Sequence, residues 1–201
     1  LKNGDLLLID AGAECKGYAA DITRTFPVSG RFTRRQRDVY QVVLEAQKSC
    51  IARTRVGVVS AELHLHSMRK LAEGLRSLGL LRGELDGLVT GGRKRRMPNP
   101  TKVPVRFIAK LEPGFVITME PGVYFIAALL NDPALRQKYK GSVDFTKAET
   151  FLDFGGVRIE DDVVVQADGP PLNLTSVPKE VADVEAACAR WAVSRARSRG
   201  S

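Results

Sequence analysis

Four acidic residues of this 201-residue chain stand beside strongly apolar neighbours, where an ionised side chain is costly to bury. Asp10 follows a Leu-Leu-Ile run, Asp21 precedes an isoleucine, Glu120 follows Ile-Thr-Met, and Glu160 follows an isoleucine. Carboxylates in such contexts need cationic partners, or they converge on a metal ion. Because carboxylate oxygens are hard ligands, the metals that they favour are Mg²⁺, Mn²⁺ and Ca²⁺.

Two of these acids are close in the sequence. Asp10 and Asp21 are eleven positions apart, and a turn over Ala13–Gly17 would set them side by side across a hairpin. Two like charges there need a cation between them, and a bridging metal meets that need. Taken singly, each of the four acids could instead form a turn, cap a helix or pair with an arginine. The four together favour a metal centre.

The elements that position the acids are predicted to be antiparallel strands flanked by helices. Apolar patterns and turn residues predict strands over 5–10, 18–26, 115–119 and 157–165, the first two forming a hairpin. Apolar spacings of three and four predict helices over 34–55, capped by Thr33, and over 60–80 and 181–193. Residues 123–130 form another apolar stretch, and 131–150 form a polar connection with weak helical character. This order predicts an α/β or α+β fold with antiparallel pairing.

The positive charge of the chain is concentrated in two segments. Lys and Arg number 31 against 23 Asp and Glu, which gives a formal net charge of +8. Seven of these cations lie within Gly91–Lys110, which contains no acid, and four more lie within Arg190–Ser201. A dedicated nucleic-acid-binding domain spreads its basic residues more widely, so nucleic acid is not an expected partner. We interpret Arg93–Arg96 as a solvated loop, with contact to an anion or nucleic acid as the alternative.

Cysteine usage and hydropathy restrict the class of protein further. Cys15, Cys50 and Cys188 are far apart and form no CxxC pair, which argues against a disulfide framework and a thiolate zinc site. Cys50 falls on the apolar face of its predicted helix, as a core thiol would. Apolar runs such as Leu6–Ile9 are far shorter than the roughly 20 residues that span a bilayer. No signal peptide is recognisable, and we expect a cytoplasmic protein without membrane contact.

Five blocks of sequence resemble the proline-specific metallopeptidases, prolidase and aminopeptidase P, of peptidase family M24. They are LIDAG at Leu8–Gly12, DITRTFP at Asp21–Pro27, LEPG at Leu111–Gly114, TMEPGVY at Thr118–Tyr124 and GVRIEDD at Gly156–Asp162. The resemblance extends over roughly four-fifths of the chain, Leu1–Gly83 and Phe107–Ala187. It implies a pita-bread fold, a pseudo-symmetric antiparallel sheet flanked by helices, here incomplete.

The same resemblance implies a role for each acid. Asp10 and Asp21 would be paired metal ligands, Glu120 a ligand and general base, and Glu160 a ligand that bridges two Mn²⁺-type ions. Arg158 would hold the substrate carboxylate or orient the site. A water between the two cations would be acidified and would attack the scissile carbonyl of a proline-containing peptide, so the implied reaction is hydrolysis of Xaa-Pro bonds. Relatives are commonly dimers, which implies a homodimer.

One expected ligand is missing from the pattern. The family carries a histidine in a His-Gly-x-Gly-His type motif before the Glu-Pro-Gly block, and this chain has no such motif. Its two histidines, His64 and His66, lie upstream and two positions apart on different faces of a predicted helix, so we interpret them as structural. An oxygen-only site should bind transition metals more weakly and accept Mg²⁺ or Ca²⁺ instead.

The predicted organisation follows from these matches. Residues 1–187 are expected to form an M24-type catalytic domain that lacks its start and a histidine-bearing segment near 84–106, and 188–201 a basic disordered tail. A chain so reduced could be inactive. The alternatives are a non-catalytic protein of the same fold, or a degenerate product with no stable fold. The non-catalytic form would contact RNA or an acidic partner through Arg93–Arg96 and through Arg195, Arg197 and Arg199.

Overall fold

Helix α1, Arg34–Arg53, is the central element of the computed structural model, which describes residues 1–90 and 108–198. Thr33 caps it, because its side chain accepts a hydrogen bond from the Gln36 N–H while the Gln36 side chain accepts one from the Thr33 N–H. The predicted helix and cap are thus confirmed. One face is fully buried and includes Tyr40 and Leu44. Each large apolar side chain on it contributes about 1.5–3 kcal/mol by its burial.

Helix α2, Ser60–Ser77, packs against α1 and confirms the second predicted helix. The contact is close at Gly74, where a Cβ atom would lie 2.5 Å from a methyl group of Val42. The helix ends at a glycine in the left-handed region, Gly79 with φ of 71°, whose N–H bonds to the Arg76 carbonyl. The two helices therefore form one layer, and the strands pack against this layer through α1.

The first predicted hairpin is present, but its second strand is interrupted. Strand β1, Leu6–Ala11, pairs antiparallel with β4, Ile22–Pro27, and Asp10 stands opposite Thr23. A small hairpin of β2, Glu14–Cys15, and β3, Tyr18–Ala19, extends from their end. The predicted continuous strand over 18–26 is wrong at Asp21, whose N–H bonds to the Asp162 side chain instead of a neighbouring strand.

The remaining strands form two further antiparallel ladders. Strand β6, Gly122–Phe125, pairs with β7, Gly155–Arg158. Strand β8, Asp161–Val164, lies between β5, Val116–Met119, and β9, Leu172–Asn173. The predicted single strand over 157–165 therefore divides at Ile159 and Glu160. There the chain changes partners, with the Ile159 N–H directed to the Pro121 carbonyl and the Glu160 N–H to the Thr23 carbonyl.

Short helices occupy the connections. They are α3 (Leu85–Thr90), α4 (Ala127–Leu130), α5 (Pro133–Tyr139) and α6 (Phe145–Glu149). Asp132 caps α5 and Asp144 caps α6, which accounts for the helical character predicted over 131–150. The apolar stretch over 123–130 divides into a strand and a helix.

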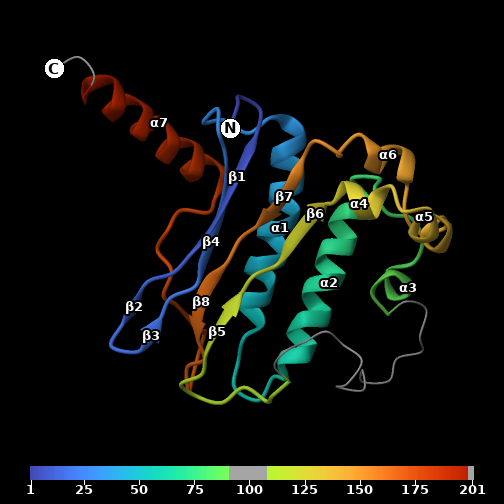
Figure 1. Cartoon of the computed structure of the whole chain (residues 1–201). Helices are drawn as coiled ribbons and strands as arrows, with labels where there is room; N and C mark the ends of the chain where they lie inside the picture. The colour runs from blue at the N-terminus through green and yellow to red at the C-terminus, as the bar shows by residue number, and fades with distance from the viewer. Residues whose placement is uncertain (91–107, 199–201) are drawn as a thin grey trace.

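The last helix, α7, spans Val181–Ser198, five residues beyond the predicted end at Val193. The prediction of a disordered tail over 188–201 is therefore wrong for 188–198, where the backbone is helical. Alanine and arginine recur in this stretch, and both are strong helix formers. Figure 1 shows α7 projecting away from the strands.

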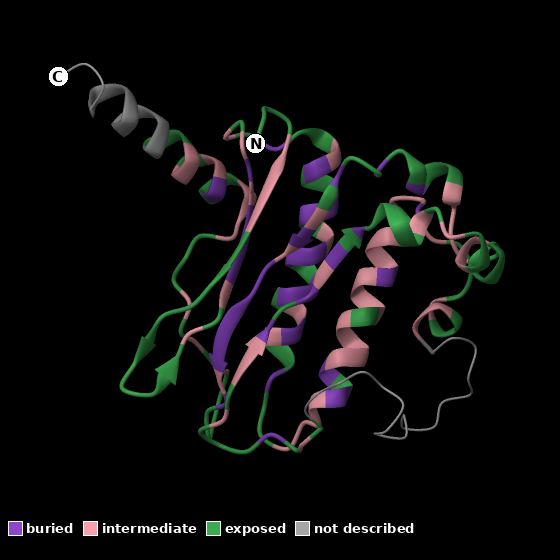
Figure 2. Cartoon of the chain, viewed as in Figure 1, coloured by how far each residue is buried: buried purple, intermediate pink, exposed green. Residues whose placement is uncertain are grey.

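The molecule has a layer of strands on a layer of helices (Figure 1), with α1 in contact with β5, β6 and β7. Burial is concentrated in β4, β8 and one face of α1 (Figure 2). Phe125, Phe151 and Phe154 form an aromatic group at one side of this core, with ring centroids 4.5–5.5 Å apart. Among the described residues, no helix combines the length and apolar character that a bilayer crossing requires.

Candidate metal centre

Three of the four predicted metal ligands meet in the structure. Asp10, Asp21 and Glu160 each direct a carboxylate oxygen to one place, and these oxygens all lie within 4.8 Å of one another. Asp10 comes from the end of β1, Asp21 from the residue before β4, and Glu160 from the break between β7 and β8. Asp21 and Glu160 thus stand outside the strands, and Asp10 lies one residue before the end of its strand.

Glu120, the fourth predicted ligand, lies nearby but outside this group. It follows β5 and is exposed, and its carboxylate accepts a hydrogen bond from the Thr118 hydroxyl at 3.4 Å. Its charge raises the pKa of Glu160, which places the two side chains within electrostatic reach. Glu120 therefore contributes to the electrostatic field at the site, but its carboxylate oxygens are not among those that converge.

Glu160 is the buried member of the group, with 1% of its surface exposed. Desolvation raises its pKa to about 7, and the negative charges of Glu120, Asp21 and Asp10 act in the same direction. The Thr23 hydroxyl opposes this shift by donating a hydrogen bond to the Glu160 carboxylate at 2.6 Å. The pKa of Asp21 is also raised, by desolvation and then by Asp10. The site thus holds more negative charge than its surroundings neutralise.

Arg158 is the cation that faces this group. It forms an ion pair with Asp10, and its Nε atom lies 3.9 Å from a Glu160 oxygen. Its Nε also donates to the Thr23 hydroxyl at 3.2 Å, and its Nη1 donates to the Tyr124 hydroxyl at 2.7 Å. One guanidinium facing three carboxylates leaves an excess of negative charge that a divalent cation would balance.

The comparisons with known proteins agree with this geometry. The model of metallopeptidase family M24 matches residues 1–167. The chain belongs to metallopeptidase family M24. A probable Xaa-Pro aminopeptidase of Metarhizium acridum is 37% identical over 221 residues, covering 94% of this chain and 42% of the relative. One from Emericella nidulans is 38% identical over 213 residues, covering 92% and 45%.

Solved structures of aminopeptidase P share the fold of the M24 chain. Pseudomonas aeruginosa aminopeptidase PepP matches with a TM-score of 0.72 and 36% identity, over 94% of this chain and 42% of that one. Zinc-substituted Escherichia coli aminopeptidase P in complex with product matches with a TM-score of 0.71, the same identity and the same coverage. The predicted pita-bread fold is confirmed and is incomplete, because the chain spans less than half the length of the curated relatives that it matches.

Three residues of the M24 chain contact the candidate ligands or Arg158 in ways that the sequence did not reveal. Thr23 bridges Glu160 and Arg158, Tyr124 holds Arg158, and the Asp162 carboxylate accepts the Asp21 N–H at 3.2 Å. All three lie inside the blocks that carry the family resemblance. Their proximity to the acids in those blocks was the signal that could have found them.

The two histidines have a separate place. The His66 ring shares a hydrogen bond of 2.7 Å with the Ser49 hydroxyl across the contact of α1 and α2. Burial lowers the pKa of both His64 and His66, and neither is in the carboxylate group. This arrangement supports their structural interpretation. Cys50 is fully buried, as predicted, and burial raises the pKa of its thiol to about 11.

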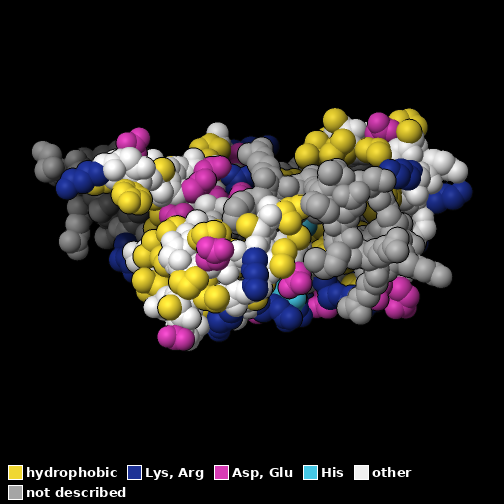
Figure 3. All heavy atoms as spheres, turned by 90° about the horizontal axis from the view of Figure 1, so that it is seen from below, with side chains coloured by type: hydrophobic (Ala, Val, Ile, Leu, Met, Phe, Trp, Pro, Cys, Tyr) yellow, Lys and Arg dark blue, Asp and Glu magenta, His cyan; other side chains and the backbone are white. Residues whose placement is uncertain are grey.

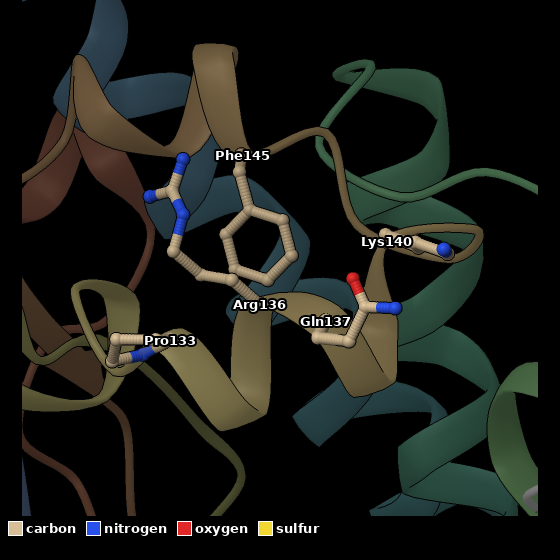
Figure 4. A pocket seen from close by; sticks show the side chains of 5 residues that line it. All are labelled: Pro133, Arg136, Gln137, Lys140 and Phe145. Atoms are coloured by element: carbon tan, nitrogen blue, oxygen red, sulfur yellow. The ribbon is translucent and has the colours of Figure 1, made fainter.

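The surface offers two other features. Acidic side chains lie next to hydrophobic ones on the face shown in Figure 3. A hollow on α5 and α6 is lined by Pro133, Arg136, Gln137, Lys140 and Phe145 (Figure 4). In this hollow the Arg136 guanidinium lies 4.8 Å from the centre of the Phe145 ring. None of the four predicted metal ligands lines it, so it is separate from the carboxylate group.

Proposed function

We propose that this M24 chain is the metal-binding part of an Xaa-Pro aminopeptidase, which hydrolyses the bond before proline with two divalent cations. The convergence of Asp10, Asp21 and Glu160 within 4.8 Å carries this proposal. Curated relatives named as Xaa-Pro aminopeptidases support the substrate class. The substrate is thus a proline-containing peptide.

The residues present fit divalent cations of the Mn²⁺ type. The donors are carboxylate oxygens, which suit hard cations, and Glu160 is buried with a pKa raised to about 7. A cation would favour the ionised form that burial disfavours. Asp10, Asp21 and Glu160 would hold the ions, with Glu120 as a further ligand. When bound, divalent cations supply Lewis acidity that polarises the scissile carbonyl and makes water a stronger nucleophile.

Other side chains of this chain take up the proton and orient the ligands. Glu120 is exposed beside the group and serves as the general base that takes up a proton. The Thr23 hydroxyl orients the Glu160 carboxylate. Arg158 is tied to Asp10, Thr23 and Tyr124, and this supports a role in orienting the site over direct capture of the substrate carboxylate.

The histidine-bearing segment is proposed to be missing near 84–106. The match to the Metarhizium acridum relative extends over 221 residues, more than the 201 residues of this chain, so the relative has internal residues that this chain lacks. Without the imidazole, one of the two cation sites is weaker. We expect activity well below that of a chain with a complete ligand set.

The alternative of a binding protein for RNA or an acidic partner depends on arginines that are not described. Arg93–Arg96 and Arg199 lie outside the described residues, and the side chains of Arg195 and Arg197 are not described either. No contact within 1–90 or 108–190 favours this alternative. The homodimer and the cytoplasmic location stay predictions.

Peptide hydrolysis tests the proposal. With Mn²⁺ present, the chain should cleave an Xaa-Pro peptide and leave the matched Xaa-Ala peptide intact, and Glu120→Gln should reduce the rate about 100-fold or more because it removes the base. The matched control is Glu112→Gln, an exposed acid of the neighbouring block. A wild-type chain that binds Mn²⁺ but cleaves no Xaa-Pro peptide would show that this chain is not a catalyst.

A further inference from the structure

A buried ion network lies directly behind the carboxylate group. Arg24 is 7% exposed and Asp161 is fully buried, and the Arg24 Nη2 atom lies 2.7 Å from the Asp161 Oδ1 atom. The other Asp161 oxygen accepts hydrogen bonds from Lys179 at 2.5 Å and from Asn173 at 2.6 Å. Both oxygens of Asp161 are therefore engaged by the protein, so Asp161 is not available as a ligand although it follows Glu160.

The Arg24 guanidinium uses its remaining donors on backbone carbonyls. Its Nη1 donates to the carbonyl of Glu160 at 2.7 Å and to that of Thr23 at 2.9 Å. Its Nη2 and Nε reach the carbonyls of Val177 and Pro178 at 2.7 and 3.0 Å. One side chain thus joins the start of β4, the break between β7 and β8, and the segment before α7.

Two of the four carbonyls that Arg24 contacts belong to Thr23 and Glu160, whose side chains meet at the candidate metal centre. The Glu160 N–H bonds to the Thr23 carbonyl at 3.0 Å, and the Thr23 hydroxyl bonds to the Glu160 carboxylate at 2.6 Å. Glu160 lies outside β7 and β8, so no ladder holds its carbonyl, and Arg24 supplies that hydrogen bond. Arg24 therefore helps to fix the direction of the Glu160 side chain at a position that no strand pairing holds.

We propose that Arg24 is a positioning residue for the metal centre. Held in place by Asp161, its guanidinium fixes the backbones of Thr23 and Glu160 so that the Glu160 carboxylate faces Asp10 and Asp21. The inference rests on the proposed metal-binding function. A lysine could keep the charge opposite Asp161, but its single nitrogen cannot reach that carboxylate and the two carbonyls at once, as Nη2 and Nη1 of Arg24 do.

A variant at Lys179 distinguishes positioning of the metal ligands from simple anchoring of Asp161. It contacts the same Asp161 carboxylate and the Gln47 side chain, and its hydrogen bonds reach neither Thr23 nor Glu160. Removal of Lys179 should therefore reduce the stability of the fold and leave the ligand geometry intact. Removal of Arg24 should alter both.

The test is a titration of metal-free protein with Mn²⁺ by calorimetry and with Co²⁺ by visible absorption, which reports ligand geometry. For Arg24→Lys we expect Mn²⁺ affinity to fall about 10–100-fold, the effect typical of lost support around ligands, together with a changed Co²⁺ spectrum. Lys179→Met should keep wild-type affinity and spectrum. So should Arg35→Lys, the matched control, because Arg35 also joins a carbonyl and an acid, Thr150 and Asp153, away from the centre.

A second variant covers the case in which Arg24→Lys does not fold. The double variant Arg24→Gln with Asp161→Asn removes both buried charges together, and the charge that then loses its ion-pair partner is that of Lys179, which can reach solvent. It should show the same loss of affinity. A folded Arg24 variant with wild-type affinity and spectrum would overturn the inference alone, whereas a wild-type chain that binds neither metal would overturn the proposed function and the inference with it.

Discussion

The two sides of the strand break at Glu160 differ in how their charges are balanced. The side that holds Asp161 and Arg24 lies behind the break, and the side that holds Asp10 and Arg158 lies in front of it. Behind the break, Arg24 and Lys179 surround Asp161. Burial acts to raise the pKa of Asp161, but hydrogen bonds from Lys179 and Asn173 and the charge of Arg24 hold it below the usual range. In front, Arg158 faces Asp10 and Glu160, and burial raises the pKa of Glu160 to about 7. Adjacent carboxylates therefore have opposite shifts. A structural network balances its own charge, and the candidate metal centre does not.

The largest effect is expected behind the break. Asp161→Asn leaves Arg24 and Lys179 facing a neutral side chain in a fully buried place, which should lower the free energy of unfolding by about 3–5 kcal/mol. Urea unfolding measures this. Asp153→Asn, which breaks an exposed ion pair, is the control and should change it by less than about 1 kcal/mol. Equal effects of the two variants would remove the contrast between a buried network and the surface.

The pH dependence of stability should come from the front of the break. Because the folded-state pKa of Glu160 is raised from 4.5 to about 7, the folded chain holds this proton more tightly than the unfolded chain. The metal-free protein should lose stability as the pH rises through this range, by an amount on the order of 3 kcal/mol. Thermal unfolding at pH 4.5 to 8 measures it. Glu160→Gln should flatten the profile, and an unchanged slope in this variant would contradict the assignment.

Thr23→Val tests the hydrogen bonds in front of the break. It keeps the shape of the side chain but removes the hydroxyl that joins Glu160 to Arg158. The Mn²⁺ affinity should fall about tenfold, measured by calorimetry on metal-free protein. Thr118→Val, which removes the weaker contact of 3.4 Å to Glu120, is the comparison and should have a smaller effect. The reverse order would show that Glu120, and not Glu160, dominates binding.

Tyr124→Phe is expected to have the smallest effect. It removes one hydrogen bond to Arg158 at a half-exposed position, and Arg158 keeps its ion pair with Asp10. The free energy of unfolding should fall by about 1 kcal/mol or less. Chemical unfolding without metal measures this, and a loss of several kcal/mol would mean that Tyr124 supports the sheet itself.

Local rules predicted the helices well and the strand breaks poorly. The Thr33 cap and the apolar face of α1 are properties of neighbouring residues, so the sequence showed them directly. The interruptions at Asp21 and Glu160 depend on hydrogen bonds to Asp162 and Thr23, which are more than 130 positions away in the chain. The alternation of apolar residues continues through both breaks, so it does not indicate where the strands are interrupted.

The candidate ligands were predictable for a different reason. Acids in apolar strand contexts are costly, and this pointed to Asp10, Asp21 and Glu160 before any arrangement was known. Thr23 and Arg24 were not singled out, because a threonine and an arginine in a strand have many ordinary roles. At the strand break, the Thr23 hydroxyl donates to the Glu160 carboxylate and the Arg24 guanidinium donates to the Glu160 carbonyl. The sequence does not show that break.

Calorimetric titration of Mn²⁺ into the metal-free chain, wild type beside Asp21→Asn, tests the central claim most directly. Asp21 belongs to the proposed ligand set with Asp10 and the buried Glu160, and Asp153→Asn serves as the matched control. We expect the wild type and the control to bind Mn²⁺ alike, and Asp21→Asn to bind it at least about tenfold more weakly. Equal binding by Asp21→Asn and the wild type, or no binding by either, would contradict this expectation.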